Sequence, residues 1–98
     1  TGSRLEPWLA FSIAYLFQGR GFQDSAVAYY ARARQSLGDT LDPLRLSVLN
    51  NIGVAQAAVK DTATARAAFD EALTLVGPTT DSRSAALVRE NLGRLARR

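Results

Sequence analysis

The chain has 98 residues, enough for one domain but not for two. Hydrophobic residues make up 47% of it, which is typical of a folded globular protein. It contains no cysteine and no histidine, which excludes disulfides, zinc sites of the Cys/His kind and the commonest general base. The formal charge is only +3, and the basic residues gather only in the last segment, "RENLGRLARR". Nucleic-acid binding, which needs clustered basic residues, is therefore not expected.

Turn-forming residues divide the chain into five segments. The turns are "QGRG" (18–21), "GDTLDP" (38–43), "KDT" (60–62) and "GPTTDS" (77–82). Each segment carries apolar residues at helical rather than alternating spacing, and alanine, a strong helix former, dominates. We therefore predict an all-α fold of five helices.

The first segment is the richest in bulky side chains. Its apolar run is broken by Ser12 and is shorter than the roughly 18–20 residues that a membrane span needs. We therefore expect no membrane segment, and a cytoplasmic location. Residues 1–4, which begin "TGS", are interpreted as a tag remnant or a disordered start. Eleven of the twelve basic residues are arginine and alanine is abundant, a bias that indicates a GC-rich, bacterial genome.

The second and fourth segments superimpose with a shift of 39 residues. Ala26, Tyr30 and Ala33 then match Ala65, Phe69 and Ala72. The first, third and fifth segments also superimpose, because Ser12, Gly53 and Gly93 are 41 and 40 residues apart. The chain is therefore interpreted as A-B-A-B-A, two and a half copies of a helical hairpin, in which small residues let the A and B helices approach closely.

Helix ends are expected at capping residues. Asp61 or Thr62 is expected to begin the fourth helix, and Asp81 or Ser82 the fifth. Gly38 and Gly77 stand where helix C-termini are expected. The aromatic residues at helical spacing are interpreted mainly as core; they are Trp8, Phe11, Tyr15, Tyr29, Tyr30 and Phe69.

The repeated pattern resembles the tetratricopeptide repeat, with its W-x2-L-G-x2-Y, A-x3-F and late proline. The first copy reads Trp8-x2-Phe11-Ser12-x2-Tyr15, then Ala26-x3-Tyr30. The second reads Leu49-x2-Ile52-Gly53-x2-Gln56, then Ala65-x3-Phe69 and Pro78, and the half copy keeps Leu92-Gly93. The period of 39–41 residues exceeds the usual value of about 34 and is similar to that of the kinesin-light-chain branch.

The resemblance implies a right-handed superhelix of antiparallel helix hairpins. Repeat 1 is then at about 5–40, repeat 2 at about 43–79, and a half repeat or capping helix at about 81–98. An alanine-rich helical bundle with chance self-similarity is the alternative.

Members of this family are scaffolds that bind a peptide or a partner helix in a concave groove, so the resemblance implies a protein partner. The groove-facing positions would be Leu9, Ile13, Leu16, Asn50, Asn51, Val54, Glu90, Asn91 and Arg94. In many members an asparagine at the place of Asn51 hydrogen-bonds the peptide backbone; the alternatives are a solvated amide or one that bonds a neighbouring helix. Arg94 and Arg97 are candidates to pair with a ligand carboxylate, or to keep an open helix end soluble.

Catalysis is not expected. Asp70 and Glu71 are adjacent and so face different directions on a helix, where both are expected to be solvated. No GxxxxGK[ST] stretch is present, so no catalytic residue, metal or cofactor is predicted. A second interpretation is self-association, with repeats stacking between chains into a homo-oligomer, because fewer than three full repeats leave apolar ends exposed.

Overall fold

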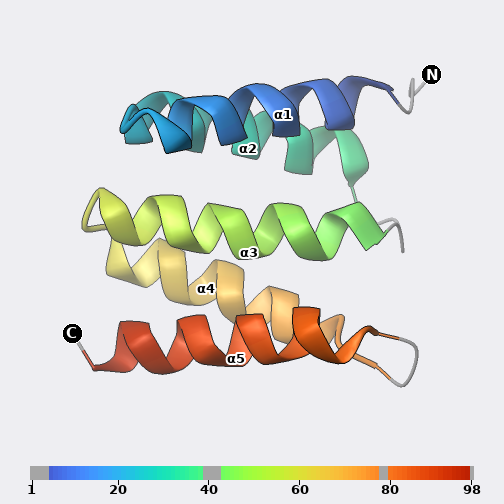
Figure 1. Cartoon of the computed structure of the whole chain (residues 1–98), viewed down its shortest axis with the longest axis vertical. Coiled ribbons are helices and arrows are strands. Elements are labelled where there is room, and N and C mark those ends of the chain that lie inside the picture. The colour runs from blue at the N-terminus through green and yellow to red at the C-terminus, as the bar shows by residue number, and fades with distance from the viewer. Residues whose placement is uncertain (1–4, 39–42, 78–79, 98) are drawn as a thin grey trace.

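The computed structural model describes residues 5–38, 43–77 and 80–97. They form five α-helices: α1 (Leu5–Gly19), α2 (Gln23–Leu37), α3 (Pro43–Ala58), α4 (Thr62–Thr74) and α5 (Ser82–Ala96). Each helix packs antiparallel on the next one in the chain (Figure 1), which confirms the predicted all-α fold of five helices. The predicted tag remnant, Pro78 and most of the long loop of repeat 1 lie outside the described residues.

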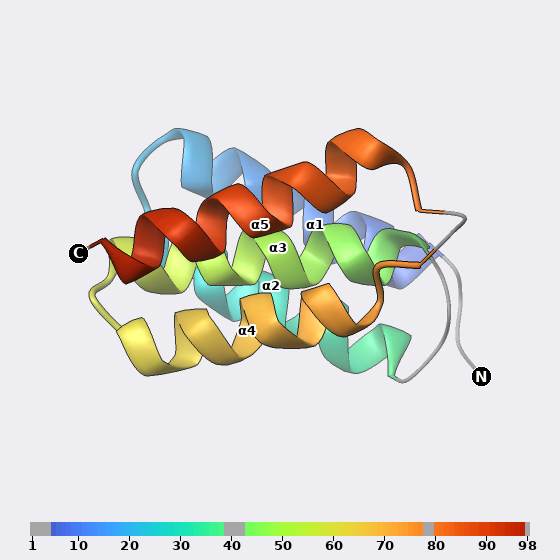
Figure 2. The ribbon, with the colours of Figure 1, turned by 90° about the horizontal axis from the view of Figure 1, so that it is seen from below.

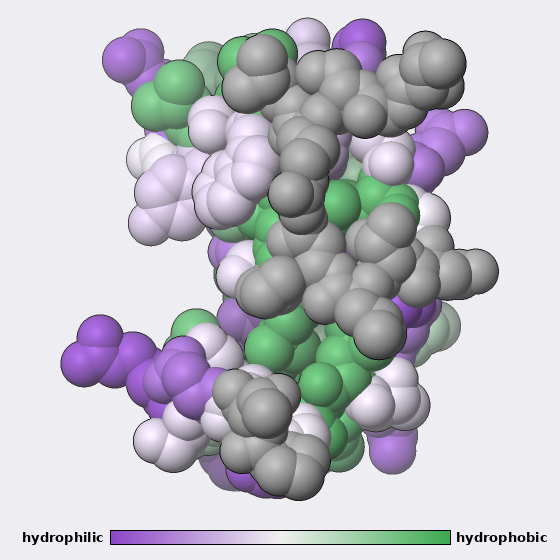
Figure 3. Space-filling model, turned by 90° about the vertical axis from the view of Figure 1, so that its right-hand side faces the viewer, coloured by the Kyte–Doolittle hydropathy of each residue, from purple (hydrophilic) through white to green (hydrophobic). Residues whose placement is uncertain are grey.

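The helices lie in two layers. Helices α1, α3 and α5 form one layer, and α2 and α4 form the other (Figures 1 and 2). Helix α3 is central, since it contacts each of the other four helices. In Figure 3 the outline is hollowed at mid-height on the side of the three-helix layer, between α1 above and α5 below. None of the described helices is long and apolar enough to cross a membrane.

Side-chain caps begin α4 and α5 where they were expected. The carboxylate of Asp61 accepts from the amide of Thr64 at 3.2 Å. Asp81 accepts from the hydroxyl of Ser84 at 2.6 Å and from the amide of Arg83 at 3.0 Å, and these donors hold the pKa of its carboxyl below the ordinary value.

Of the two glycines expected at helix C-termini, the structure confirms one. Gly38 follows α2 with φ +59°, a left-handed conformation that glycine adopts without strain. Helix α4, by contrast, ends at Thr74 and not at Gly77. The amides of Leu75 and Val76 bond to carbonyls three residues back, which tightens and closes the last turn before the glycine.

The residues matched between the second and fourth segments occupy equivalent core positions. All six are buried: Ala26, Tyr30 and Ala33 in α2, and Ala65, Phe69 and Ala72 in α4. Tyr30 and Phe69 are the two largest fully buried side chains of the described residues. The alignment of these two helices therefore predicted the core correctly.

The small-residue match among the A helices is confirmed only at Gly53. A Cβ atom there would lie closer than 3.0 Å to three atoms of the Phe69 ring, so α3 and α4 touch at this glycine. At Gly93 a Cβ atom would meet only the side chain of Arg97, at 3.4 Å, which is ordinary van der Waals contact. Ser12 is exposed, so its expected role against α2 is wrong. Ala10 and Ala14, both buried, take that place.

Helix α1 is turned about its axis relative to the expected position. This rotation lets Phe11 pack on Tyr30, with ring centroids 5.8 Å apart, and lets Phe17 stack on Tyr29 at 5.6 Å. In exchange it leaves Trp8 and Tyr15 exposed. The expectation that the aromatic residues form core is therefore wrong for Trp8 and Tyr15.

Gly53→Ala should destabilise the protein by about 1–3 kcal/mol, because the new methyl group overlaps a buried ring. Gly93→Ala is the matched control and should stabilise the protein by roughly 0.5–1 kcal/mol, since it only raises helix propensity. Urea unfolding of both variants measures the difference. Equal effects at the two positions would contradict the close α3–α4 contact.

Burial, with a smaller effect from Tyr15, raises the pKa of Tyr30 from 10.0 to about 12. Because the folded state holds this proton more tightly, its stabilising effect is complete below pH 10 and is lost as the pH rises towards 12. We expect a loss on the order of 2 kcal/mol over this range, and a smaller loss in Tyr30→Phe. Urea unfolding at pH 9 and pH 11.5 makes the comparison. Parallel losses in the two proteins would show that Tyr30 does not ionise on unfolding.

Candidate functional site

Helix α1 exposes large apolar side chains on both of its flanks. The exposed fractions are 53% for Trp8, 61% for Leu9, 37% for Ile13, 62% for Tyr15 and 64% for Leu16. No charged residue stands between Glu6 and Arg20. With about 150–250 Å² for each side chain, these fractions sum to an area on the order of 500 Å². Surface patches of this size on monomeric proteins are often binding sites.

The contacts of α2 show which way the flanks of α1 point. Arg34 pairs with Glu71 of α4, so this side of α2 faces the rest of the stack. Arg32 lies two residues earlier, about 160° around the helix, and so faces the outer end of the stack. The Arg32 Nε atom lies 3.5 Å from a carboxylate oxygen of Glu6. The Glu6 flank of α1 therefore faces the outer end as well.

The predicted groove residues of α1 continue along this outer flank. Leu9, Ile13 and Leu16 follow Glu6 at intervals of three, four and three residues. Trp8 and Tyr15 lie about 100° around the helix from Leu9 and Leu16, on the side towards α3 and the hollow. The structure thus separates the three apolar residues from the predicted groove residues of α3 and α5. Their role as partner contacts stays a prediction.

Two other predicted residues meet in the interior. The amide nitrogen of Asn91 donates to the amide oxygen of Asn50 at 2.9 Å, and both side chains are buried. This bond joins α3 to α5. Sequence reasoning placed both residues in the groove but did not pair them. The available signal was their separation of 41 residues, about one repeat, which brings equivalent positions of stacked helices together.

Asn51 bonds within its own helix. Its amide nitrogen donates to the carbonyl of Ser47 at 2.9 Å, and the residue is half-buried. This bond differs from both alternatives to peptide binding given above, which were a solvated amide and a bond to a neighbouring helix. Its amide oxygen is the group that remains to be offered to a ligand.

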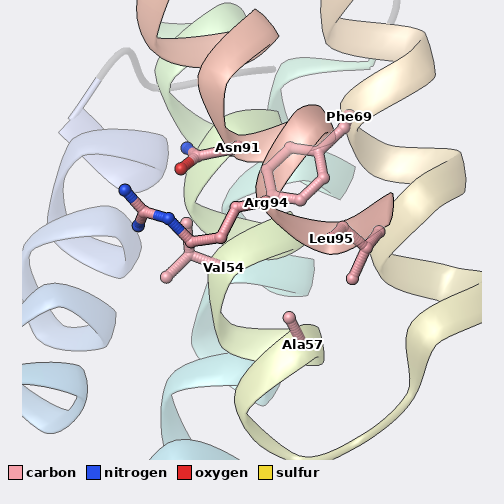
Figure 4. Close-up of a pocket in the computed structure, with 6 residues that line it drawn as sticks. All are labelled: Val54, Ala57, Phe69, Asn91, Arg94 and Leu95. Atoms are coloured by element: carbon pink, nitrogen blue, oxygen red, sulfur yellow. The ribbon is translucent and has the colours of Figure 1, made fainter. Parts of the chain in front are cut away.

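A small pocket lies beside the asparagine pair. Its volume is about 60 Å³, and its lining residues are Val54, Ala57, Phe69, Asn91, Arg94 and Leu95 (Figure 4). This volume holds a few water molecules, whereas ligand pockets usually have about 300–1,000 Å³. Arg94 donates to Glu90 at 2.8 Å in an exposed pair. The pocket is therefore too small for an organic ligand.

A larger cleft, of about 450 Å³, opens between α2 and α4 above α3. Its lining residues are Val27, Ala31, Arg34, Gln35, Gly38, Ile52, Gln56, Thr64 and Glu71. Glu71 pairs with Arg34 on one oxygen and with Arg45 at 3.1 Å on the other, so it is not solvated as expected. Asp70 is exposed as expected, with Arg66 at 3.9 Å. Sequence reasoning missed this cleft, because no motif marks it.

The asparagine pair makes a testable contribution to stability. Asn91→Ala and Asn50→Ala should each cost about 1–3 kcal/mol, because each leaves a buried amide without its partner. The double variant should cost clearly less than the sum of the two. Urea unfolding of the four proteins forms a double-mutant cycle. Strictly additive losses would mean that the two amides do not depend on each other.

Comparison of the chain with protein-family models, with curated proteins and with solved structures gave no match. The assignment of a site therefore rests on the geometry alone. That geometry consists of an apolar surface on α1, a hollow lined by α1, α3 and α5, and a cleft between α2 and α4 on the opposite layer.

Proposed function

We propose that this chain is a protein-interaction module, and that α1 supplies its main binding surface. The observation that carries the proposal is the exposure of five large apolar side chains on one helix with no charge among them. Covering this surface removes apolar area from water, which is the dominant favourable term in most protein association. An amphipathic helix of a partner, laid along α1, fits such a surface best.

We further propose that the fold is a short tetratricopeptide-like array with the longer repeat period. The equivalent buried residues of α2 and α4 and the close Gly53–Phe69 approach support this proposal. The departure is α1, where Ser12 is exposed and two alanines face α2 instead. Within the part of the chain that the structure describes, no other element covers the exposed apolar side chains of α1. In this proposal they are where a partner docks.

Polar groups at the rim of the hollow would orient a ligand. Among the described residues, the bond recorded for the Asn51 side chain uses its amide nitrogen, and the exposed Arg94 on α5 pairs with Glu90. An exposed pair of this kind contributes little, so a ligand carboxylate can compete for the arginine. On this rim the neighbouring apolar residues are Trp8 and Tyr15, whereas Leu9, Ile13 and Leu16 lie on the outer flank of α1 and would bind a partner there.

The proposal is tested by affinity capture from a lysate of the source organism, read by mass spectrometry. Wild-type protein should retain a partner that Leu9→Glu/Leu16→Glu reduces at least about tenfold, because buried charges oppose apolar docking. Ala63→Glu/Ala67→Glu, on exposed positions of α4, adds the same charges elsewhere and is the control. Circular dichroism and urea unfolding confirm that all three proteins are folded. Identical capture by all three would overturn the proposed binding surface.

A further inference from the structure

We infer that the partner of α1 is a second copy of this chain, and that two α1 helices pair antiparallel along a single stripe. This inference rests on the proposed function, since it names the partner for the same surface. The stripe, here called the α1 stripe, consists of Glu6, Leu9, Ile13, Leu16 and Arg20.

The α1 stripe has the spacing of a helix-pairing seam. Its members follow one another at intervals of three, four, three and four residues, the heptad spacing of paired helices. All five are exposed. Arg20 lies one residue beyond α1, but its amide donates to the carbonyl of Leu16 at 3.2 Å, so it continues the helical path. The stripe is therefore one continuous line of about 21 Å.

The order of residues along the α1 stripe selects an antiparallel second copy. The stripe is nearly symmetric about Ile13, with one leucine three or four residues away and one charged residue seven residues away on each side. In an antiparallel pair, Glu6 faces the partner's Arg20, Leu9 faces the partner's Leu16, and Ile13 lies on the two-fold axis. A parallel pair would instead place like charges together at both ends. Closed two-fold pairing is also the commonest symmetry of homo-oligomers.

The α1 stripe is accessible, because it lies on the flank that faces the outer end of the stack. Within the part of the chain that the structure describes, the contact recorded on it is the 3.5 Å pair between Glu6 and Arg32. Both of these side chains are more than half exposed, so this pair is weak. The second oxygen of Glu6 can therefore receive the partner's Arg20.

The area that two copies can bury determines how tightly the dimer is expected to form. The whole apolar surface of two copies amounts to about 1,000 Å², but Trp8 and Tyr15 lie outside the α1 stripe, so the pair buries less than this, below the usual size of specific complexes. We therefore expect a weak dimer with a dissociation constant in the micromolar range or above. Measurements need protein concentrations from about 10 μM to about 1 mM to bracket it.

Sedimentation equilibrium with charge reversals tests the pairing. Glu6→Arg and Arg20→Glu should each weaken the dimer by roughly tenfold or more, because both ends of the pair then carry like charges. An equimolar mixture of the two variants should restore it, since each now complements the other. Asp70→Arg breaks a similarly exposed pair with Arg66 and is the matched control, which should leave the dimer unchanged. A dimer insensitive to Glu6→Arg would overturn the antiparallel register.

Disulfide trapping tests the register directly, because the chain has no cysteine of its own. Ile13→Cys should form a covalent dimer under mild oxidation, since two copies of this position meet on the axis. Leu9→Cys alone should not, whereas Leu9→Cys/Leu16→Cys should. Ser12→Cys, exposed on the same helix but beside the α1 stripe, is the control. Efficient trapping by Leu9→Cys alone would indicate a parallel pair and overturn the inference.

The two proposals fail in different ways. A chain that stays monomeric at about 1 mM, while capture finds a different protein that Leu9→Glu/Leu16→Glu loses, overturns the second-copy inference and leaves the interaction module standing. A monomer whose captured proteins do not depend on the α1 stripe overturns both. A dimer that Glu6→Arg and Leu9→Glu/Leu16→Glu both weaken supports both.

Discussion

The packing of the molecule depends on the contact between a backbone without a side chain and a buried aromatic ring. Gly53 lies at the middle of α3, and the ring of Phe69 fills the space that a Cβ atom would need. This contact sets the separation of α3 and α4. Because α5 packs on both of these helices, its position depends on the same contact. The buried Asn50–Asn91 bond then adds a directional contact that apolar packing cannot supply.

The first hairpin, formed by α1 and α2, packs differently from the second hairpin, formed by α3 and α4. In α2 the buried face is the same as in α4, but α1 presents Ala10 and Ala14 to it rather than Ser12. Two aromatic pairs between α1 and α2 accompany this rotation. The effect is to expose apolar residues on both flanks of α1. The helix that departs most from the repeat is thus also the one with the largest surface available to a partner.

The sequence was sufficient to predict five helices, their caps at Asp61 and Asp81, and the equivalent core residues of α2 and α4. These features follow from local rules, namely turn residues, helical periodicity and alanine spacing. The rotation of α1 was not predicted, because the helix is apolar on most sides and no polar face fixes its orientation. The Asn50–Asn91 bond and the ion pairs of Glu71 were missed for a related reason. They join residues 26 to 41 positions apart, and only the stacking of the helices brings such residues into contact.

The ion pairs of Glu71 have a mechanical consequence for the way the two hairpins are joined. Within the described residues α2 and α4 do not pack on each other directly, and a cleft separates them. One carboxylate, held by arginines of α2 and α3, spans that gap. The two hairpins are therefore joined on this side by ion pairs as well as by the apolar cluster that includes Ala68 of α4. The Arg45–Glu71 pair is partly buried and only weakly screened by salt, whereas the Arg34–Glu71 pair is exposed, so salt should loosen the link to α2 before the link to α3.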